Sequence, residues 1–158
     1  VFLVVLYLDF AGARWWALGI FVVACLTDFV DGYIARHYNQ ITNFGKFMDP
    51  LADKMLVMAA MCYFVERGQM PGWCLAIVLL REFAVSGMRL VAVEQGRVIA
   101  AAWSGKIKTA STMVCLCLML VFSSSVLNLV CSVLIVATTV YSGIEYFAKN
   151  LDVFKEAD

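Results

Sequence analysis

The sequence predicts an all-α fold, a polytopic membrane helix bundle that forms a single domain over residues 1–158. Hydrophobic residues make up 63% of the chain, and the mean hydropathy is +0.87. A soluble domain of this length is nearer half apolar, so we expect lipid to cover the outside. The apolar stretches alternate with short polar breaks, and the chain has only two prolines. This pattern favours long helices joined by short turns.

The first apolar stretch is too short to span a membrane. Residues 1–8 read VFLVVLYL, whereas a spanning helix needs about 20 residues. We expect this stretch to be the last part of a first helix whose beginning precedes the chain. The polar break DFAGAR follows, and the next apolar stretch predicts a helix over residues 14–38.

Four more helices are expected. The break HYNQITNF precedes a helix over 44–66, and ERGQMPG forms a turn before a helix over 72–95. EQGRVIAAAW leads to a helix over 104–122, and three serines separate it from a last helix over 126–148. At about 1.5 Å per residue each segment can cross the hydrocarbon core. With the first helix complete, the bundle has six transmembrane helices.

Lysine and arginine are distributed unevenly between the two ends of the predicted helices. Cytoplasmic connections of membrane proteins carry an excess of these residues. The richer end has seven, namely Arg36, Lys46, Arg97, Lys106, Lys108, Lys149 and Lys155. The other end has only Arg14 and Arg67. We therefore expect the richer end and the C-terminus to face the cytoplasm.

Four carboxylates gather in two of the predicted helices, although acids are costly in a membrane. Asp28 and Asp31 are three residues apart, and Asp49 and Asp53 are four apart, so each pair shares a helix face. A short loop joins the two helices, which makes them antiparallel neighbours. Both pairs can then meet in the cytoplasmic half of the bilayer, near the lipid headgroups.

An all-oxygen ligand set without histidine or cysteine selects the hard cations Mg²⁺ or Mn²⁺ over zinc. The six cysteines form no CxxC pair and are expected to be free thiols packed as small hydrophobes. A salt-bridged polar seam that holds the bundle together is the alternative for the acids. Lys54, Arg36 and His37 could neutralise part of their charge.

Small residues and a proline accompany the acids. Gly32, Ala35 and Gly45 allow either the close approach of a ligand or close helix packing. Pro50 removes a helical N–H and is expected to kink its helix beside Asp49. Alternatively, Pro50 is the first residue of a helix that Asp49 caps.

This pattern resembles the CDP-alcohol phosphotransferase family, whose signature is D-x2-D-G-x2-A-R-x8-G-x3-D-x3-D. All eight positions are present with the exact spacing, as Asp28, Asp31, Gly32, Ala35, Arg36, Gly45, Asp49 and Asp53. The resemblance extends over essentially the whole chain. It implies an integral membrane enzyme of six helices, usually a homodimer.

The resemblance also implies roles for the signature residues. Two divalent metal ions, Mg²⁺ or Mn²⁺, are expected to hold the diphosphate of a CDP-linked lipid. Their expected ligands are Asp28, Asp31, Asp49 and Asp53. Asp53 is also the expected general base. The cytidine diphosphate site is expected to be lined by Gly32, Ala35, Arg36 and Gly45.

Two further segments bear on the acceptor alcohol. REFAVSGMRL at 81–90 and WSGKIKT at 103–109 resemble segments of bacterial phosphatidylglycerophosphate synthases. The resemblance implies that CDP-diacylglycerol and sn-glycerol 3-phosphate are joined at the cytoplasmic face of a bacterial inner membrane, with release of CMP. The candidate contacts to the acceptor phosphate are Arg81, Arg89, Lys106 and Lys108.

Structural roles compete with these acceptor contacts. Glu82, Ser86 and Arg89 share one helical stripe, and Arg81 points about 100° away. An intrahelical Glu82–Arg89 pair, or a pair between Arg81 and an acid, would have purely structural value. The lysines of the WSGKIKT segment could equally be ordinary anchors at the cytoplasmic surface.

Other functions remain possible at this point. A sibling transferase could use inositol phosphate, serine or phosphatidylglycerol as acceptor. A divalent-cation transporter would distribute polar residues along a path through the bilayer, whereas here they concentrate in its cytoplasmic half. The zero net charge gives no support for a nucleic-acid partner.

Overall fold

The computed structural model describes residues 2–8, 12–38, 43–94, 102–122 and 124–150, without the side chains of residues 25, 28–53 and 94. These residues form helices and connecting turns and no strand. The helices are α1 (Phe2–Tyr7), α2 (Ala13–Tyr38), α3 (Asn43–Glu66), α4 (Gly72–Glu94), α5 (Trp103–Val121) and α6 (Ser125–Lys149). The all-α prediction is confirmed, and the described ends of α2 to α6 fall within one residue of those predicted.

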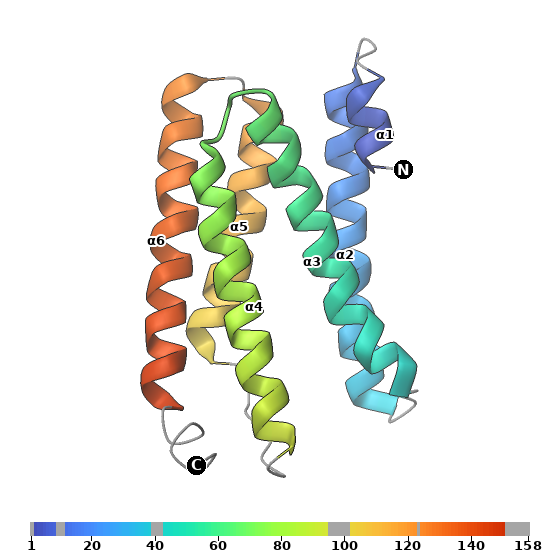
Figure 1. The fold of residues 1–158 in the computed structure, drawn as a ribbon. Helices are drawn as coiled ribbons and strands as arrows, with labels where there is room; N and C mark the ends of the chain where they lie inside the picture. The colour runs from blue at the N-terminus through green and yellow to red at the C-terminus, as the bar shows by residue number, and fades with distance from the viewer. Residues whose placement is uncertain (1, 9–11, 39–42, 95–101, 123, 151–158) are drawn as a thin grey trace.

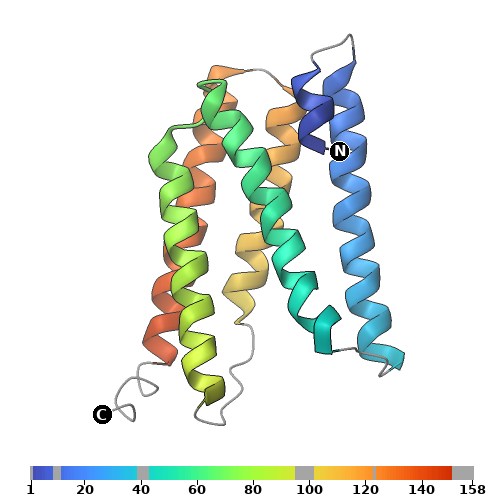
Figure 2. The same cartoon turned by 45° about the vertical axis from the view of Figure 1, so that its right-hand side comes forward.

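The five long helices alternate in direction along the chain (Figures 1 and 2). The C-terminal ends of α2, α4 and α6 and the N-terminal ends of α3 and α5 therefore share one end of the bundle, drawn at the bottom of Figure 1. Arg36, Lys46 and Lys149 belong to helix segments at this end. Arg14 begins α2 at the opposite end. The described part of the chain thus has the uneven charge distribution that the sequence predicted.

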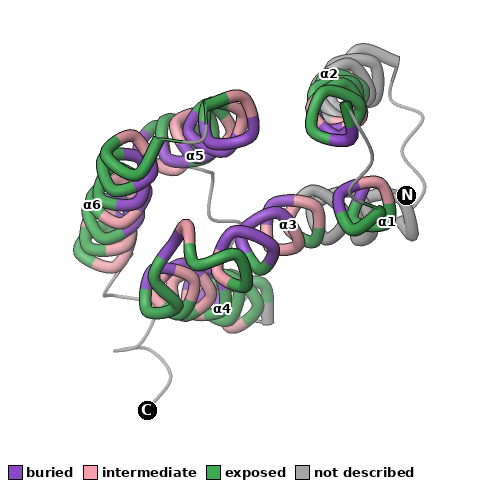
Figure 3. Tube along the Cα trace, turned by 90° about the horizontal axis from the view of Figure 1, so that it is seen from above, coloured by how far each residue is buried: buried purple, intermediate pink, exposed green. Residues whose placement is uncertain are grey.

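Seen from above, α6 lies between α4 and α5 and packs against both (Figure 3). The third helix packs on α4 and touches α5, while α2 contacts α1, α3 and α5. Within the described helices, α4 and α5 do not pack directly on each other. Side chains must therefore bridge the space between α4 and α5.

The apolar core joins all the helices at the end opposite to the acids. Phe21 of α2, Phe64 of α3 and Leu116 of α5 are fully buried there. The ring of Phe2 packs on Phe21 with centroids 5.6 Å apart. This packing places α1 against α2 and α3.

Two helices, α5 and α6, are long and apolar enough to cross a membrane, with hydropathies of 1.3 and 1.8. The helices α2, α3 and α4 have 26, 24 and 23 residues, which is also sufficient length, but charged residues interrupt them. Large apolar side chains face outward, among them Leu129, Val133 and Ile144 of α6. The protein is an integral membrane protein, and these apolar outer faces suit contact with lipid.

Exposed tryptophans mark both ends of the bundle. Trp15, Trp16 and Trp73 are exposed at the beginnings of α2 and α4, and Trp103 is exposed at the beginning of α5 at the opposite end. Tryptophan favours the interface between lipid and water because its ring is amphipathic. The two sets mark the levels at which the bundle leaves the hydrocarbon core.

The turn between α3 and α4 depends on a glycine. Gly68 has φ +66°, a left-handed conformation that side chains disfavour. Its N–H donates to the carbonyl of Val65 at 3.0 Å, and the Gln69 N–H donates to the carbonyl of Phe64 at 2.8 Å. These bonds satisfy the last carbonyls of α3 and let the chain reverse.

The third helix begins at Asn43 and runs through Pro50. The alternative in which Asp49 caps a helix that starts at Pro50 is therefore wrong. An earlier start is favoured because the apolar segment needs these residues to reach across the membrane. The kink beside Asp49 stays a prediction.

Candidate functional site

The four signature acids lie on neighbouring helices. Asp28 and Asp31 belong to α2, and Asp49 and Asp53 belong to α3. The two helices contact each other and run in opposite directions (Figure 1). The antiparallel hairpin predicted from the sequence is therefore confirmed at the level of the helices.

The side chains of the signature residues lie outside the described part of the structure. This applies to the expected metal ligands and also to Gly32, Ala35, Arg36 and Gly45. The expected metal and nucleotide contacts thus stay predictions. The donor set itself fits a divalent cation, since four carboxylates on two adjacent helices supply only oxygen ligands.

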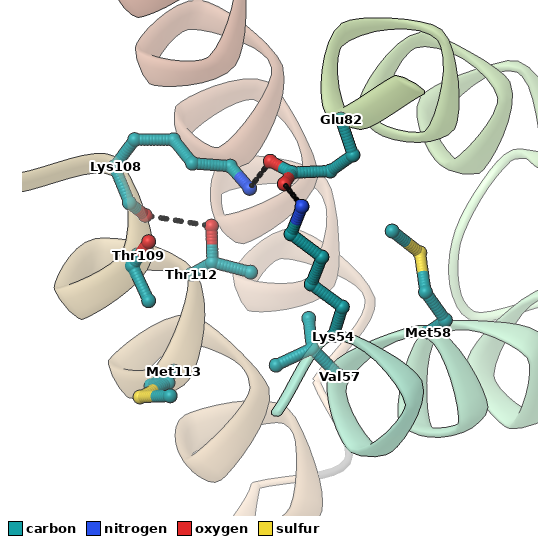
Figure 4. A pocket seen from close by; sticks show the side chains of 8 residues that line it. All are labelled: Lys54, Val57, Met58, Glu82, Lys108, Thr109, Thr112 and Met113. Carbon is teal, nitrogen blue, oxygen red and sulfur yellow. Dashed lines mark hydrogen bonds and ion pairs between the residues drawn. The ribbon is translucent and has the colours of Figure 1, made fainter. Parts of the chain in front are cut away.

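A cluster of charged side chains lies beyond the acids on α3. Its centre is Glu82, near the middle of α4, whose side chain is only 11% exposed. Lys108 Nζ lies 2.7 Å from Glu82 Oε1, and Arg81 Nη1 lies 3.0 Å from the same oxygen. Lys54 Nζ lies 3.3 Å from Oε2. Figure 4 shows both lysines pointing at the carboxylate. Among the described side chains, three cations thus meet one carboxylate.

Three helices contribute to this cluster. Lys54 belongs to α3 and directly follows Asp53, so it ties the cluster to the acidic segment. Its Nζ also donates to Ser86 Oγ on α4 at 2.8 Å. Lys108 reaches Glu82 from α5, and its side chain is only 7% exposed. A lysine buried this deeply needs a charged partner, because an unpaired ammonium is costly away from water.

A cavity of about 170 Å³ opens beside the cluster. It lies between α3, α4 and α5 and is drawn in Figure 4. Its lining is Lys54, Val57, Met58, Glu82, Lys108, Thr109, Thr112 and Met113. The charged groups therefore border a space that a small anionic ligand could enter.

The structure separates the four predicted acceptor contacts. Arg81 and Lys108 meet at Glu82. Arg89 Nε instead donates to the Tyr146 hydroxyl at 3.1 Å, and its guanidinium lies 5.5 Å from the centre of the same ring. Arg81 and Lys108 thus form one group beside the cavity, and Arg89 lies apart from them at the contact between α4 and α6.

Lys106 also lies apart from the cavity. It is exposed, and its Nζ lies 4.9 Å from the centre of the Trp103 ring. Lys106 and Lys108 are two residues apart, and side chains so spaced point in different directions on a helix. The WSGKIKT segment therefore directs one lysine into the bundle and leaves the other at its surface.

Of the structural alternatives, the pair between Arg81 and an acid is present, because Arg81 binds Glu82. An intrahelical Glu82–Arg89 pair is not among the described contacts. Sequence reasoning assigned Lys54 only to neutralising the aspartates and did not place it with the acceptor contacts. A lysine inside an apolar helix needs a partner, and the acid of the next helix, Glu82, was the available signal.

Comparison with known proteins gives a consistent result. Residues 1–141 match the family model described as CDP-alcohol phosphatidyltransferase. The chain is 43% identical to the CDP-diacylglycerol–glycerol-3-phosphate 3-phosphatidyltransferase of Bacillus subtilis, with 88% of this chain and 75% of that protein aligned.

Two other relatives carry related names. The chain is 38% identical to a probable phosphatidylglycerophosphate synthase of Mycobacterium tuberculosis, with 89% of this chain and 68% of that protein aligned. It is 40% identical to the CDP-diacylglycerol–glycerol-3-phosphate 3-phosphatidyltransferase of Escherichia coli, over 73% of this chain and 65% of that protein.

Proposed function

The chain belongs to the CDP-alcohol phosphatidyltransferase family and is a transferase, and from this premise we propose its reaction. It transfers the phosphatidyl group of CDP-diacylglycerol to sn-glycerol 3-phosphate, which gives phosphatidylglycerophosphate and CMP. The names of the relatives in Bacillus subtilis and Escherichia coli support this choice of donor and acceptor. The reaction is a step of phospholipid biosynthesis.

The observation that carries the choice of acceptor is the meeting of three cations at Glu82 beside a cavity. Of the described side chains, one carboxylate faces three cations, so this cavity suits an anion. Arginine binds phosphate through several N–H donors, and lysine binds it as a compact charge. An acceptor with its own phosphate fits this site better than serine, which has none. We assign Arg81, Lys108 and Lys54 to the acceptor phosphate.

The cluster also lies at the right place along α3. Lys54 follows Asp53 directly, so the acceptor phosphate sits close to the acidic segment. The hydroxyl of the acceptor can then extend towards the diphosphate of the lipid. The positions assigned to Arg89 and Lys106 are outside this cavity, and we assign them supporting roles at the α4–α6 contact and at the membrane surface.

In the proposed reaction, the acceptor hydroxyl oxygen attacks the phosphorus that carries diacylglycerol. A new P–O bond forms as the P–O bond to CMP breaks, and CMP leaves with the electron pair. Asp53 takes the hydroxyl proton as general base. Arg81 and Lys108 hold the acceptor phosphate so that the hydroxyl keeps its orientation.

Two divalent ions complete this proposal, with Asp28, Asp31, Asp49 and Asp53 as their ligands. When bound, Mg²⁺ or Mn²⁺ offsets the negative charge of the diphosphate. Gly32, Ala35, Arg36 and Gly45 line the nucleotide side of the site in this proposal. These assignments rest on the family signature in the sequence.

We also propose that the acidic end of the bundle faces the cytoplasm of a bacterial inner membrane. Lysine and arginine are enriched at that end, as expected for a cytoplasmic surface. The functional unit in this proposal is a homodimer, as the family resemblance implies.

The proposed reaction is tested with the protein purified in detergent and supplied with CDP-diacylglycerol. Release of CMP is measured with sn-glycerol 3-phosphate, inositol phosphate, serine and phosphatidylglycerol in parallel, with Mg²⁺ or with a chelator. We expect CMP release only with glycerol 3-phosphate and a divalent ion. Release with another acceptor alone would identify a sibling transferase instead.

A further inference from the structure

The side chain of Arg81 passes close to two glycines of neighbouring helices. A Cβ atom placed at Gly143 of α6 would lie 3.3 Å from Arg81 Cγ. A Cβ atom at Gly105 of α5 would lie 3.5 Å from Arg81 Nη2. The aliphatic stem of this arginine thus passes Gly143, and its guanidinium ends beside Gly105.

The helix arrangement explains why Arg81 needs room here. Arg81 belongs to α4, and α6 lies between α4 and α5 (Figure 3). The stem of Arg81 lies against α6, so the residue of α6 at that point must leave room for it. Gly143 provides that room, because glycine has no side chain to fill the path.

The guanidinium is held with donors to spare. Arg81 is 13% exposed in its side chain, and one of its nitrogens binds Glu82. Its Nε has no hydrogen-bond partner among the described residues, although it is buried. A buried guanidinium nitrogen without a partner is costly, and a bound anion would remove that cost.

We propose that Gly143 is a positioning residue that seats Arg81 for the acceptor phosphate. This inference rests on the proposed function and deepens it, since it names what fixes the specificity for a phosphate-bearing acceptor. The stem of Arg81 lies so close to the Gly143 position that an alanine there makes the stem move by a few tenths of an ångström. A Cβ at Gly105 would be in ordinary van der Waals contact with Arg81 Nη2, so an alanine there leaves the guanidinium in place.

Steady-state kinetics of three alanine variants test the proposal. We expect Gly143→Ala to raise the KM for glycerol 3-phosphate on the order of tenfold, as for a weakened charge-assisted contact. The KM for CDP-diacylglycerol stays unchanged. Gly105→Ala leaves the acceptor KM nearly unchanged, because its Cβ fits beside the guanidinium at ordinary contact distance. Gly87→Ala on α4, where a Cβ meets nothing within 4 Å, is the matched control and leaves both constants unchanged.

A purely structural role for Gly143 makes a different prediction. In that case Gly143→Ala would lower kcat and the unfolding temperature together and would change the KM of both substrates alike, which would overturn the proposal. In an Arg81→Ala background, Gly143→Ala should have little additional effect, because the Cγ atom that it displaces is gone. A full additional effect there would also overturn it.

Failure of the inference about Gly143 can be distinguished from failure of the proposed reaction. If Gly143→Ala does not fold, Arg81→Ala decides, and an unchanged acceptor KM in that variant refutes the seat. The parent protein tests the proposed function independently. If glycerol 3-phosphate releases no CMP from the parent, the reaction is wrong, whatever the variants show.

Discussion

Replacing Glu82 by glutamine should destabilise the protein strongly, because it removes the one acid described between three cations. Lys108 and Arg81 are the important partners, since their side chains are only 7% and 13% exposed. Lys54 is 37% exposed, so water screens it and its share is small. Breaking a buried ion pair by removing one partner costs about 3–5 kcal/mol.

For a chain of this length, such a loss lowers the unfolding temperature by roughly 6–20 °C. The assay is thermal unfolding in detergent, in which the helical circular dichroism signal at 222 nm is followed. Glu145→Gln is the matched control, because Glu145 pairs with Lys149 at the surface of α6 and is partly open to water. We expect the unfolding temperature of the control to equal that of the parent protein.

A double variant separates charge from packing. Adding Lys108→Met to Glu82→Gln removes one stranded cation, so it should recover part of the lost stability, with a coupling of about 0.5–3 kcal/mol. Unfolding of Glu82→Gln within about 2 °C of the parent would contradict a stabilising role for the buried pairs. A double variant no more stable than Glu82→Gln alone would contradict it as well.

Three further predictions follow from the site and the fold. Asp31→Asn should abolish metal-dependent CMP release while the unfolding temperature stays near that of the parent; turnover at the parent rate would contradict the assigned metal role. Lys108→Met should raise the KM for glycerol 3-phosphate by about tenfold or more, whereas Lys106→Met at the surface should leave it nearly unchanged, and equal effects would refute the assignment. Gly68→Ala should lower the stability by about 1 kcal/mol because of the left-handed backbone, as measured by thermal unfolding; a neutral result would mean that the turn adapts.

Much of the fold could be predicted because the membrane simplifies the physics. Each long apolar run must form a helix, since lipid offers no partner for backbone groups. The breaks between runs then fix the helix ends, as for α5, predicted over 104–122 and observed over Trp103–Val121. The order of helix directions follows from the short connections alone.

The side-chain partners were harder to predict because they depend on tertiary contacts between helices. The stripe of α4 placed Glu82 and Arg89 together, but the structure gives each a partner on a different helix. Lys106 and Lys108 are close in sequence, and only the helix register shows that one is buried. No periodicity in the sequence could reveal that Gly143 makes room for a side chain from α4.

The shared end of the five long helices affects how reactants reach the site and how products leave it. The C-terminal ends of α2 and α4 and the N-terminal ends of α3 and α5 lie at this same end of the bundle. A water-soluble reactant can therefore enter, and a water-soluble leaving group can depart, at this one end, and neither has to cross the bilayer. Only the fatty-acid-bearing molecule must arrive sideways, by diffusion within its own leaflet. In sealed vesicles, reagents added outside would not reach protein inserted with this end facing inward. The fraction of protein that reacts would therefore report its orientation.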